Sequence, residues 1–131
     1  MPKAKYTKDH EWVRLEEGSK ESEQIGIVGI TDYAQEQLGD IVFVELPEVG
    51  QTVQKGDEAA TIESVKAASE FFTPVGGKVI NINNAIIDDP GLINSDPGEV
   101  GWFFSLQLTD PSELESLMDE TEYESFVNSL S

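Results

Sequence analysis

The sequence lacks several residue types on which common protein chemistries depend. It has no cysteine, a single histidine, and 8 basic residues against 26 acidic ones in a chain of 131 residues. Without cysteine there are no disulfides, thiolate metal sites or thiol nucleophiles, so any sulfur redox chemistry would have to arrive on a cofactor. The formal net charge of −18 repels phosphate backbones and argues against nucleic-acid binding.

Patterns for membrane insertion and for metal or phosphate chemistry are also missing. No apolar segment follows the basic residues near the N-terminus, so we predict a cytoplasmic protein of bacterial type with no membrane partner. His10 and Glu11 are adjacent but belong to no multi-ligand motif, and the acidic residues 88–96 lack calcium-loop spacing, so we predict no metal site. A stand-alone enzyme is disfavoured, although carboxylate catalysis remains an alternative, as does a pure interaction module.

The length suits one domain, which could bury about two-thirds of the surface exposed by the unfolded chain. Short strand-like segments dominate, and we predict a mainly β, monomeric protein. We predict a single domain at residues 1–131, with its β core at about 24–108 and a helical C-terminal segment at 110–131.

Apolar patterning predicts the strands of this core. Trp12 begins a strand that turns near Gly18 and returns over residues 24–30, and a last strand with one apolar face covers 102–108. Residues 40–47 are almost continuously apolar, which predicts a central strand covered on both faces. Residues 84–98 are rich in turn-forming residues and are predicted to be a loop.

Three short helices are expected from capping signals. Residues 31–39 form one helix, with Asp32 and Gln35 as a capping box and Gly39 as its end. Asp110 with Pro111 begins a second helix, and Thr121 with Glu124 begins the last one.

Lys66 is the one cation between Lys55 and Lys78, and it lies between two strand-like segments, 60–63 and 69–73. This spacing predicts a hairpin with Lys66 at its tip. Taken alone, such a lysine is usually an ordinary solvated side chain. Its small neighbours nevertheless suit a lysine that must enter other proteins, as in group carriers, where the cofactor supplies the chemistry.

Three segments around this lysine, residues 50–57, 63–67 and 74–79, resemble the lipoyl-attachment hairpin of glycine cleavage system H proteins. The resemblance extends to residues 10–12, to 29–34 with 38–40, and to 90–97, although Gly98 departs from the family pattern, which often has an aromatic residue there. It implies a lipoyl/biotinyl-type barrel-sandwich hybrid with a short inserted helix and C-terminal helices.

The resemblance also implies a function. Lys66 would carry lipoate covalently, within an attachment motif formed by Glu63, Ser64, Val65 and Ala67. The protein would be a non-catalytic shuttle that takes the aminomethyl group of glycine from a pyridoxal-phosphate glycine decarboxylase to a folate-dependent aminomethyltransferase. Dihydrolipoamide dehydrogenase would reoxidise the arm, and a lipoate ligase or lipoyl transferase would attach it.

Two other carrier roles are alternatives. The chain could relay lipoyl groups to other acceptor proteins, which the sequence does not separate from glycine cleavage. A biotinyl carrier is the other, although biotin-accepting lysines in similar families are usually flanked by methionines, whereas Lys66 lies between Val65 and Ala67.

A loaded carrier would also have to protect a hydrolysis-prone aminomethyl group. Such a group is a primary amine, and carboxylates in a partly desolvated cleft could hold its cation. The resemblance places carboxylates at Glu11 and Glu70, and Asp9 is a third candidate. We predict that these residues form an aminomethyl-arm cleft.

Overall fold

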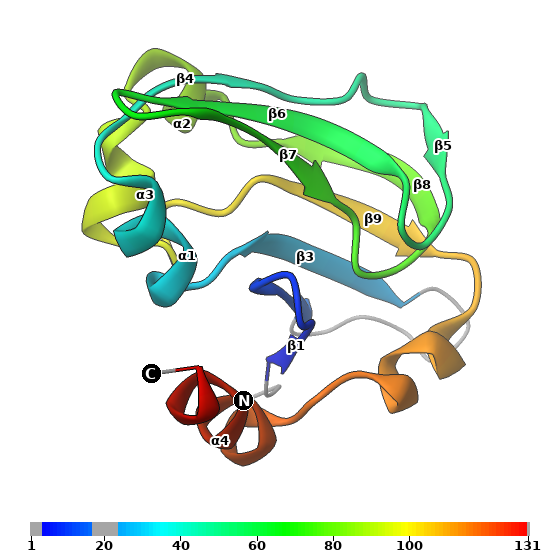
Figure 1. Cartoon of the computed structure of the whole chain (residues 1–131). Helices are drawn as coiled ribbons and strands as arrows, with labels where there is room; N and C mark the ends of the chain where they lie inside the picture. The colour runs from blue at the N-terminus through cyan, green and yellow to red at the C-terminus, as the bar shows by residue number, and fades with distance from the viewer. Residues whose placement is uncertain (1–3, 17–23, 131) are drawn as a thin grey trace.

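The computed structural model describes residues 4–16 and 24–130. Two antiparallel sheets face each other in it (Figure 1), and the larger has the strand order β1-β2-β3-β9-β8-β5. Its strands are β1 (Lys5–Tyr6), β2 (Glu11–Leu15), β3 (Ile25–Ile30), β9 (Phe104–Leu108), β8 (Gly77–Ile82) and β5 (Thr52–Val53). The predicted turn near Gly18 lies outside the described residues.

The smaller sheet, which we call the hairpin sheet, has the order β4-β6-β7. Its strands are β4 (Ile41–Glu45), β6 (Glu58–Ser64) and β7 (Ala68–Phe72). Side chains from both sheets meet in one apolar core, where Phe71 of the hairpin sheet lies 4.9 Å from Phe103 and 5.7 Å from Phe104 between ring centroids. This two-layer arrangement confirms the predicted mainly β barrel-sandwich fold.

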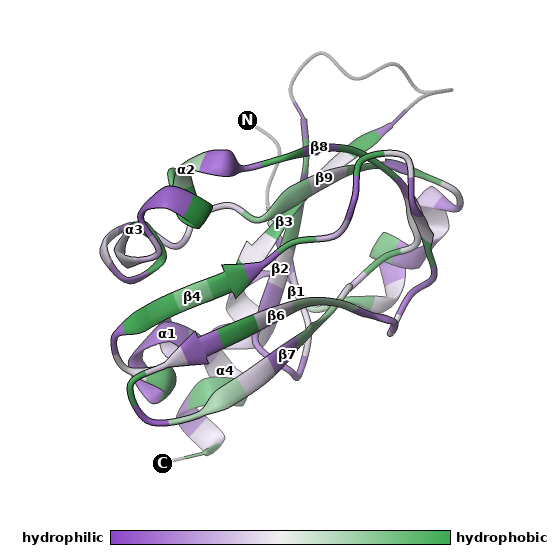
Figure 2. Cartoon of the chain, turned by 90° about the horizontal axis from the view of Figure 1, so that it is seen from above, coloured by the Kyte–Doolittle hydropathy of each residue, from purple (hydrophilic) through white to green (hydrophobic). Residues whose placement is uncertain are grey.

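Strand β4 is an edge strand, so its predicted central position is wrong. Among the described residues it pairs with β6 alone, and Val42 and Phe43 are 55% and 45% exposed although the strand is apolar up to its final glutamate (Figure 2). A bulge between Ile41 and Phe43 breaks the alternation of faces, so two consecutive apolar residues reach solvent. Helices cover part of the strand.

Two short helices, α2 (Asn84–Asp88) and α3 (Gly91–Ser95), occupy most of the segment predicted as a loop. Each inserts one isoleucine, Ile86 or Ile93, completely into the core, and both helices contact β4. The Asn83 side chain begins α2 by accepting a hydrogen bond from the Ala85 amide. Tertiary burial of two isoleucines therefore overrides the turn-forming composition.

The inserted helix α1 (Asp32–Leu38) is confirmed, but its cap lies one residue earlier than predicted. Thr31 is the N-cap and accepts from the Ala34 amide, while Asp32 is inside the first turn and accepts from the Gln35 side chain. Gly39 ends the helix in a left-handed conformation with φ of 78°, as its predicted role as the end of the helix requires.

The C-terminal segment contains a 3-10 helix, η1 (Pro111–Ser116), and the helix α4 (Glu120–Ser129). Asp110 caps η1 as predicted, and the Glu113 carboxylate accepts a hydrogen bond from the Gly76 amide. The last helix begins at Asp119 with a box to Glu122, two residues before the predicted Thr121. Among the described residues, no helix is long and apolar enough to cross a membrane.

Candidate functional site

The predicted hairpin with Lys66 at its tip is confirmed. Strands β6 and β7 pair up to Glu63 and Ala68, and the turn between them spans Ser64 to Ala67. Without Gly, Asn or Pro, the turn depends on the Ser64 hydroxyl, which accepts from the amides of Lys66 at 3.2 Å and Ala67 at 3.1 Å. The Ser64 amide also donates to the Ala67 carbonyl at 2.8 Å. Side-chain hydrogen bonds thus order a tip that lacks a usual turn residue.

The junction between α1 and β4 supports the tip from behind. The Val65 amide donates to the Asp40 carbonyl at 3.0 Å, and a β-carbon on Gly39 would lie 3.2 Å from Lys66 Cε. Asn94 of α3 holds this junction by donating to the Gly39 carbonyl at 2.9 Å and accepting from the Ile41 amide at 2.9 Å. The lysine therefore projects from a braced position.

Lys66 itself is exposed and forms no ion pair with the part of the chain that the structure describes. Val65 beside it is 66% exposed, and Ala67 is exposed as well. Glu63 is exposed on the outer face of the hairpin sheet, where it pairs with Phe43 on one side and Ala68 on the other. A modifying enzyme could therefore reach the lysine and its neighbours from solvent.

A small cleft lies beside the hairpin, between α1, β7 and the start of β2. Its volume is about 170 Å³, and its lining includes all three predicted carboxylate residues, Asp9, Glu11 and Glu70. Leu38 also lines the cleft and is next to Gly39, against which the Lys66 stem lies. The fold thus brings the lysine and the three acidic residues to one side of the molecule.

Glu11 is the buried member of this set, with 3% of its surface exposed. One carboxylate oxygen accepts from the Phe72 amide at 2.8 Å, and the other accepts from the Thr7 hydroxyl at 3.1 Å. Burial nevertheless dominates and raises the pKa of Glu11 from 4.5 to about 7, with a smaller contribution from the charge of Asp9. Glu11 is therefore half-protonated near neutral pH.

Glu70 and Asp9 are exposed, unlike Glu11. The Glu70 carboxylate forms a hydrogen bond with the carboxyl group of Glu58. This hydrogen bond is the largest cause of a raised pKa of Glu58, and the negative charge of Glu70 is the second. Two carboxylates so close repel each other when both are ionised, so a cation placed between them would be favoured.

His10 lies in the cleft wall with a left-handed backbone, φ 68°. Its ring packs 4.4 Å from Tyr33 and its Nδ1 is 2.7 Å from the Tyr123 hydroxyl of α4. Desolvation lowers the pKa of His10. Within residues 4–16 and 24–130, no group of three or more candidate ligands could hold a metal ion.

Sequence reasoning missed Gly39 and Asn94, which support the tip, and Glu58, which interacts with Glu70 but does not line the cleft. Glu58 could have been found from register, because it pairs with Phe72, two residues from Glu70 on β7. The sequence indicates Gly39 only as the end of a helix. No sequence signal indicates Asn94, because its partners are 53 to 59 residues away in the chain.

An exposed lysine on a hairpin tip of a two-sheet barrel-sandwich defines the class of lipoyl/biotinyl-type carrier domains. Comparisons with known proteins identify the family within this class. The family model described as "Glycine cleavage H-protein" matches residues 4–130. The chain therefore belongs to the glycine cleavage H-protein family.

Individual relatives agree. The chain is 52% identical to the glycine cleavage system H protein of Methylocella silvestris over 130 residues, which cover 99% of each protein. It is 52% identical over 123 residues to the Escherichia coli O7:K1 protein of that name, covering 94% of this chain and 92% of the relative.

A solved structure supports the same assignment. The crystal structure of a glycine cleavage system H protein from Mycobacterium marinum matches with a TM-score of 0.85 and 40% identity, covering 96% of this chain and 97% of that one. The family assignment makes the chain a lipoyl carrier of the glycine cleavage system and supports that interpretation over lipoyl relay or biotin carriage.

Proposed function

We propose that Lys66 is the residue that carries the lipoyl group, in amide linkage to Nζ, and that the chain is a carrier without catalytic activity of its own. The observation that carries this proposal is the position of Lys66, exposed on a tip ordered by Ser64 and braced by Gly39 and Asp40. When bound, the lipoyl group supplies the dithiol chemistry that this cysteine-free chain lacks.

The residues around Lys66 fit such a group. Val65 and Ala67 are small or modest in size and leave Nζ accessible, and Glu63, Ser64, Val65 and Ala67 form the motif that a lipoate ligase or lipoyl transferase would recognise. The cleft beside the hairpin gives the far end of a flexible arm a surface to settle on.

The cleft carboxylates supply the complementary charge. Glu11, Glu70 and Asp9 would accept hydrogen bonds from an ammonium group and exclude part of the surrounding water. Charge-assisted hydrogen bonds of this kind contribute about 1.5–3 kcal/mol when well buried. Glu11, the buried one, is expected to contribute more than the exposed Asp9 and Glu70.

The proposed partners are the proteins that must meet Lys66 in turn. These are the pyridoxal-phosphate glycine decarboxylase, the folate-dependent aminomethyltransferase and dihydrolipoamide dehydrogenase, in the cytoplasm. Tethering the group to one small carrier raises its effective concentration at each active site.

Intact-mass analysis tests the attachment site. Incubation with a lipoate ligase should add one lipoyl group to the wild type and to Lys78→Arg, an exposed lysine on β8 that serves as control. Lys66→Arg should gain none. Modification that persists in Lys66→Arg would overturn the assignment.

Release of formaldehyde and ammonia tests the cleft. The carrier is loaded with the glycine-derived aminomethyl group and incubated without aminomethyltransferase. Glu11→Gln should accelerate release about 10-fold, as loss of one well-placed charge-assisted contact implies, and Glu70→Gln should have a smaller effect. Glu36→Gln, an exposed acid of α1 outside the cleft lining, is the matched control. Equal release by all four proteins would show that these carboxylates do not shield the group.

A further inference from the structure

A second, larger cavity lies next to the aminomethyl-arm cleft. The contact between His10 and Tyr123 lies between the two, since His10 lines the cleft and Tyr123 lines the larger cavity. Its volume is about 540 Å³, within the range of sites for small organic ligands. Helix α4, strand β1, the start of α1 and the turn at Pro97 surround it, and the walls include Tyr6, Trp12, Thr31, Tyr33 and Tyr123. The carrier role assigns no function to this cavity.

Aromatic rings form much of its wall. Tyr6 and Tyr123 stack with ring centroids 4.7 Å apart and planes 13° from parallel. The Trp12 indole N–H is fixed by the carbonyls of Ile30 at 2.9 Å and Pro97 at 3.1 Å. Since both hydrogen-bond partners are backbone groups, these walls are held in place without a ligand.

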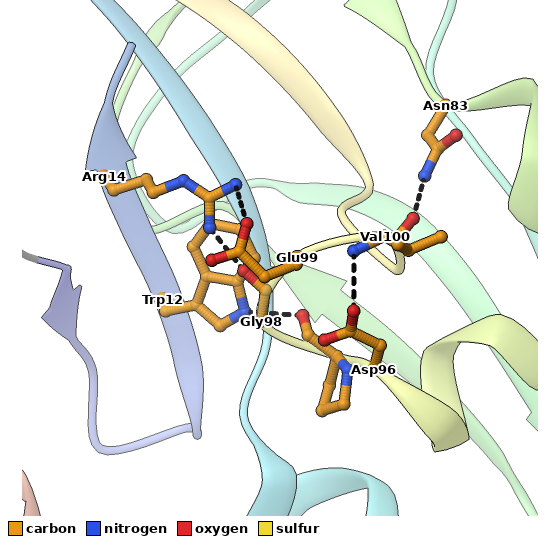
Figure 3. Close-up of polar contacts among 8 residues, drawn as sticks. Trp12, Arg14, Asn83, Asp96, Gly98, Glu99 and Val100 are labelled. Carbon is orange, nitrogen blue, oxygen red and sulfur yellow. Dashed lines mark hydrogen bonds and ion pairs between the residues drawn. The ribbon is translucent and has the colours of Figure 1, made fainter. Parts of the chain in front are cut away.

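The turn from Asp96 to Gly101 holds the Trp12 side of the cavity (Figure 3). Asp96 accepts from the Val100 amide, and the Val100 carbonyl accepts from the Asn83 side chain at 2.8 Å. Arg14 lies over the Trp12 ring at 4.7 Å and donates to the Gly98 carbonyl, with Glu99 as its ion-pair partner at 3.7 Å. Arg14 does not line the cavity, and its charge is already matched.

The charged residues that line the cavity are all acidic: Asp32, Glu120 and Glu124, with no lysine or arginine among the described lining residues. Asp32 and Glu120 lie in first turns of helices, where acids are common. Glu124 lies in the middle of α4, so capping does not explain it. After burial, the charges of Glu120 and Glu124 are the next causes that raise the pKa of Tyr6, so their negative field reaches the aromatic wall.

We infer that this cavity is a binding site for an organic cation, an ammonium or guanidinium group attached to an apolar body. Tyrosine rings attract such cations through their electron-rich faces, and a partly desolvated site strengthens the attraction. The three carboxylates select the positive charge, while the 540 Å³ volume accommodates the apolar body. The chemistry is that of a free amine or of a lysine or arginine side chain presented by a partner protein.

A ligand in this cavity would affect the aminomethyl-arm cleft, because the two cavities share part of their walls. Ile30 lines both cavities. The Tyr123 hydroxyl lies 2.8 Å from Thr31 Oγ1 in the larger cavity and 2.7 Å from Nδ1 of His10 in the cleft wall. A ligand that moves Tyr123 would therefore change the environment of His10.

NMR titration of the full-length lipoylated chain tests the inference. The probes are benzylammonium, its neutral analogue benzyl alcohol, and the capped tripeptide acetyl-Gly-Arg-Gly-amide. At least one cationic probe should shift the Trp12 indole resonance saturably, and the indole resonance of Trp102, which does not line the cavity, is the internal control. Benzyl alcohol should bind at least about 5-fold more weakly than benzylammonium, as expected when a cation–π contact is lost.

Variants link the binding to the cavity. Glu124→Gln should weaken cation binding about 2- to 5-fold, the range for one exposed charge pair, and Tyr6→Leu should weaken it by a similar factor. Glu36→Gln, which changes the net charge equally from outside the cavity, should leave it unchanged.

The pattern of responses also identifies the source of the cation. Binding of benzylammonium alone indicates a free amine, whereas binding of the arginine tripeptide indicates a side chain from a partner. Absence of saturable shifts at Trp12 with both cations would overturn the inference, as would equal binding of benzyl alcohol or equal effects of Glu124→Gln and Glu36→Gln.

Discussion

At Glu11, burial and hydrogen bonding act on the carboxyl group in opposite directions. The amide of Phe72 and the hydroxyl of Thr7 favour the ionised form, yet burial wins and raises the pKa to about 7. A residue that could hold a cation in the cleft is therefore partly neutral when no cation is present. Binding an ammonium group there would favour loss of the proton.

This shift makes a prediction about stability. Between pH 4.5 and 7 the folded chain keeps the Glu11 proton that the unfolded chain loses, so the ionisation of Glu11 lowers the free energy of unfolding as pH rises. The cost reaches at most about 3 kcal/mol above pH 7, from 1.36 kcal/mol per pKa unit. In Glu11→Gln the cost is absent, and the amide can still accept from Phe72.

Urea unfolding at pH 4.5, 6 and 8 measures the effect. The stability of Glu11→Gln relative to wild type should rise across this window and level off above pH 7. A stability difference that is constant with pH would contradict the assigned titration.

Glu63 shows how little one exposed carboxylate needs to contribute to the fold. It lies on the outer face of β6 between Phe43 and Ala68, and no hydrogen bond or ion pair of its side chain is found within the described residues. Glu63→Ala should change the unfolding free energy by less than about 0.5 kcal/mol. If a ligase recognises Glu63, the rate of lipoylation should fall severalfold, and equal initial rates for mutant and wild type would exclude that role.

At the scale of elements, the β6–β7 hairpin depends on one hydroxyl group. Ser64→Ala removes the acceptor for the amides of Lys66 and Ala67, and should destabilise the turn by about 1 kcal/mol. Hydrogen exchange should speed up about fivefold at these two amides, but not at Ile62 deeper in β6. Unchanged exchange at the tip would mean that the strands alone order it.

The hairpin was predictable from sequence because two strand-like segments flank Lys66 closely, and the family resemblance marked the lysine. The edge position of strand β4 was not predictable, because an apolar edge strand and an apolar central strand have the same composition. Helices α2 and α3 are five residues each, too short for a helical period to be distinguished from turns. Capping signals predicted α1 and α4 but placed their N-caps one and two residues late, because adjacent residues could serve equally well.

The family resemblance, and not any local sequence pattern, predicted that Glu11 and Glu70 belong to the cleft. Glu11 is 59 residues from Glu70 in the sequence, and nothing local predicts that they line one cavity. Glu11 lies beside β7 because its carboxylate accepts from the amide of Phe72, the last residue of that strand.

At the scale of the whole molecule, the net charge and the packing of the C-terminal segment both bear on how Lys66 is presented to partner proteins. We propose that residues 1–131 act as a single unit, in which Glu113 ties the C-terminal segment to Gly76 and Tyr123 ties α4 to His10. The formal net charge of −18 should steer the carrier toward basic faces on its partners. The Lys66 tip is then presented from a rigid body to several enzymes in turn.

Reconstituted glycine decarboxylation tests this account most directly. Release of CO2 from carboxyl-labelled glycine is measured with the decarboxylase, aminomethyltransferase and dehydrogenase, using the lipoylated chain or Lys66→Arg treated with the same ligase. The account predicts sustained release with the wild type, declining as salt screens the acidic surface, and background release with Lys66→Arg. Release by Lys66→Arg at the wild-type rate would contradict the carrier role of Lys66.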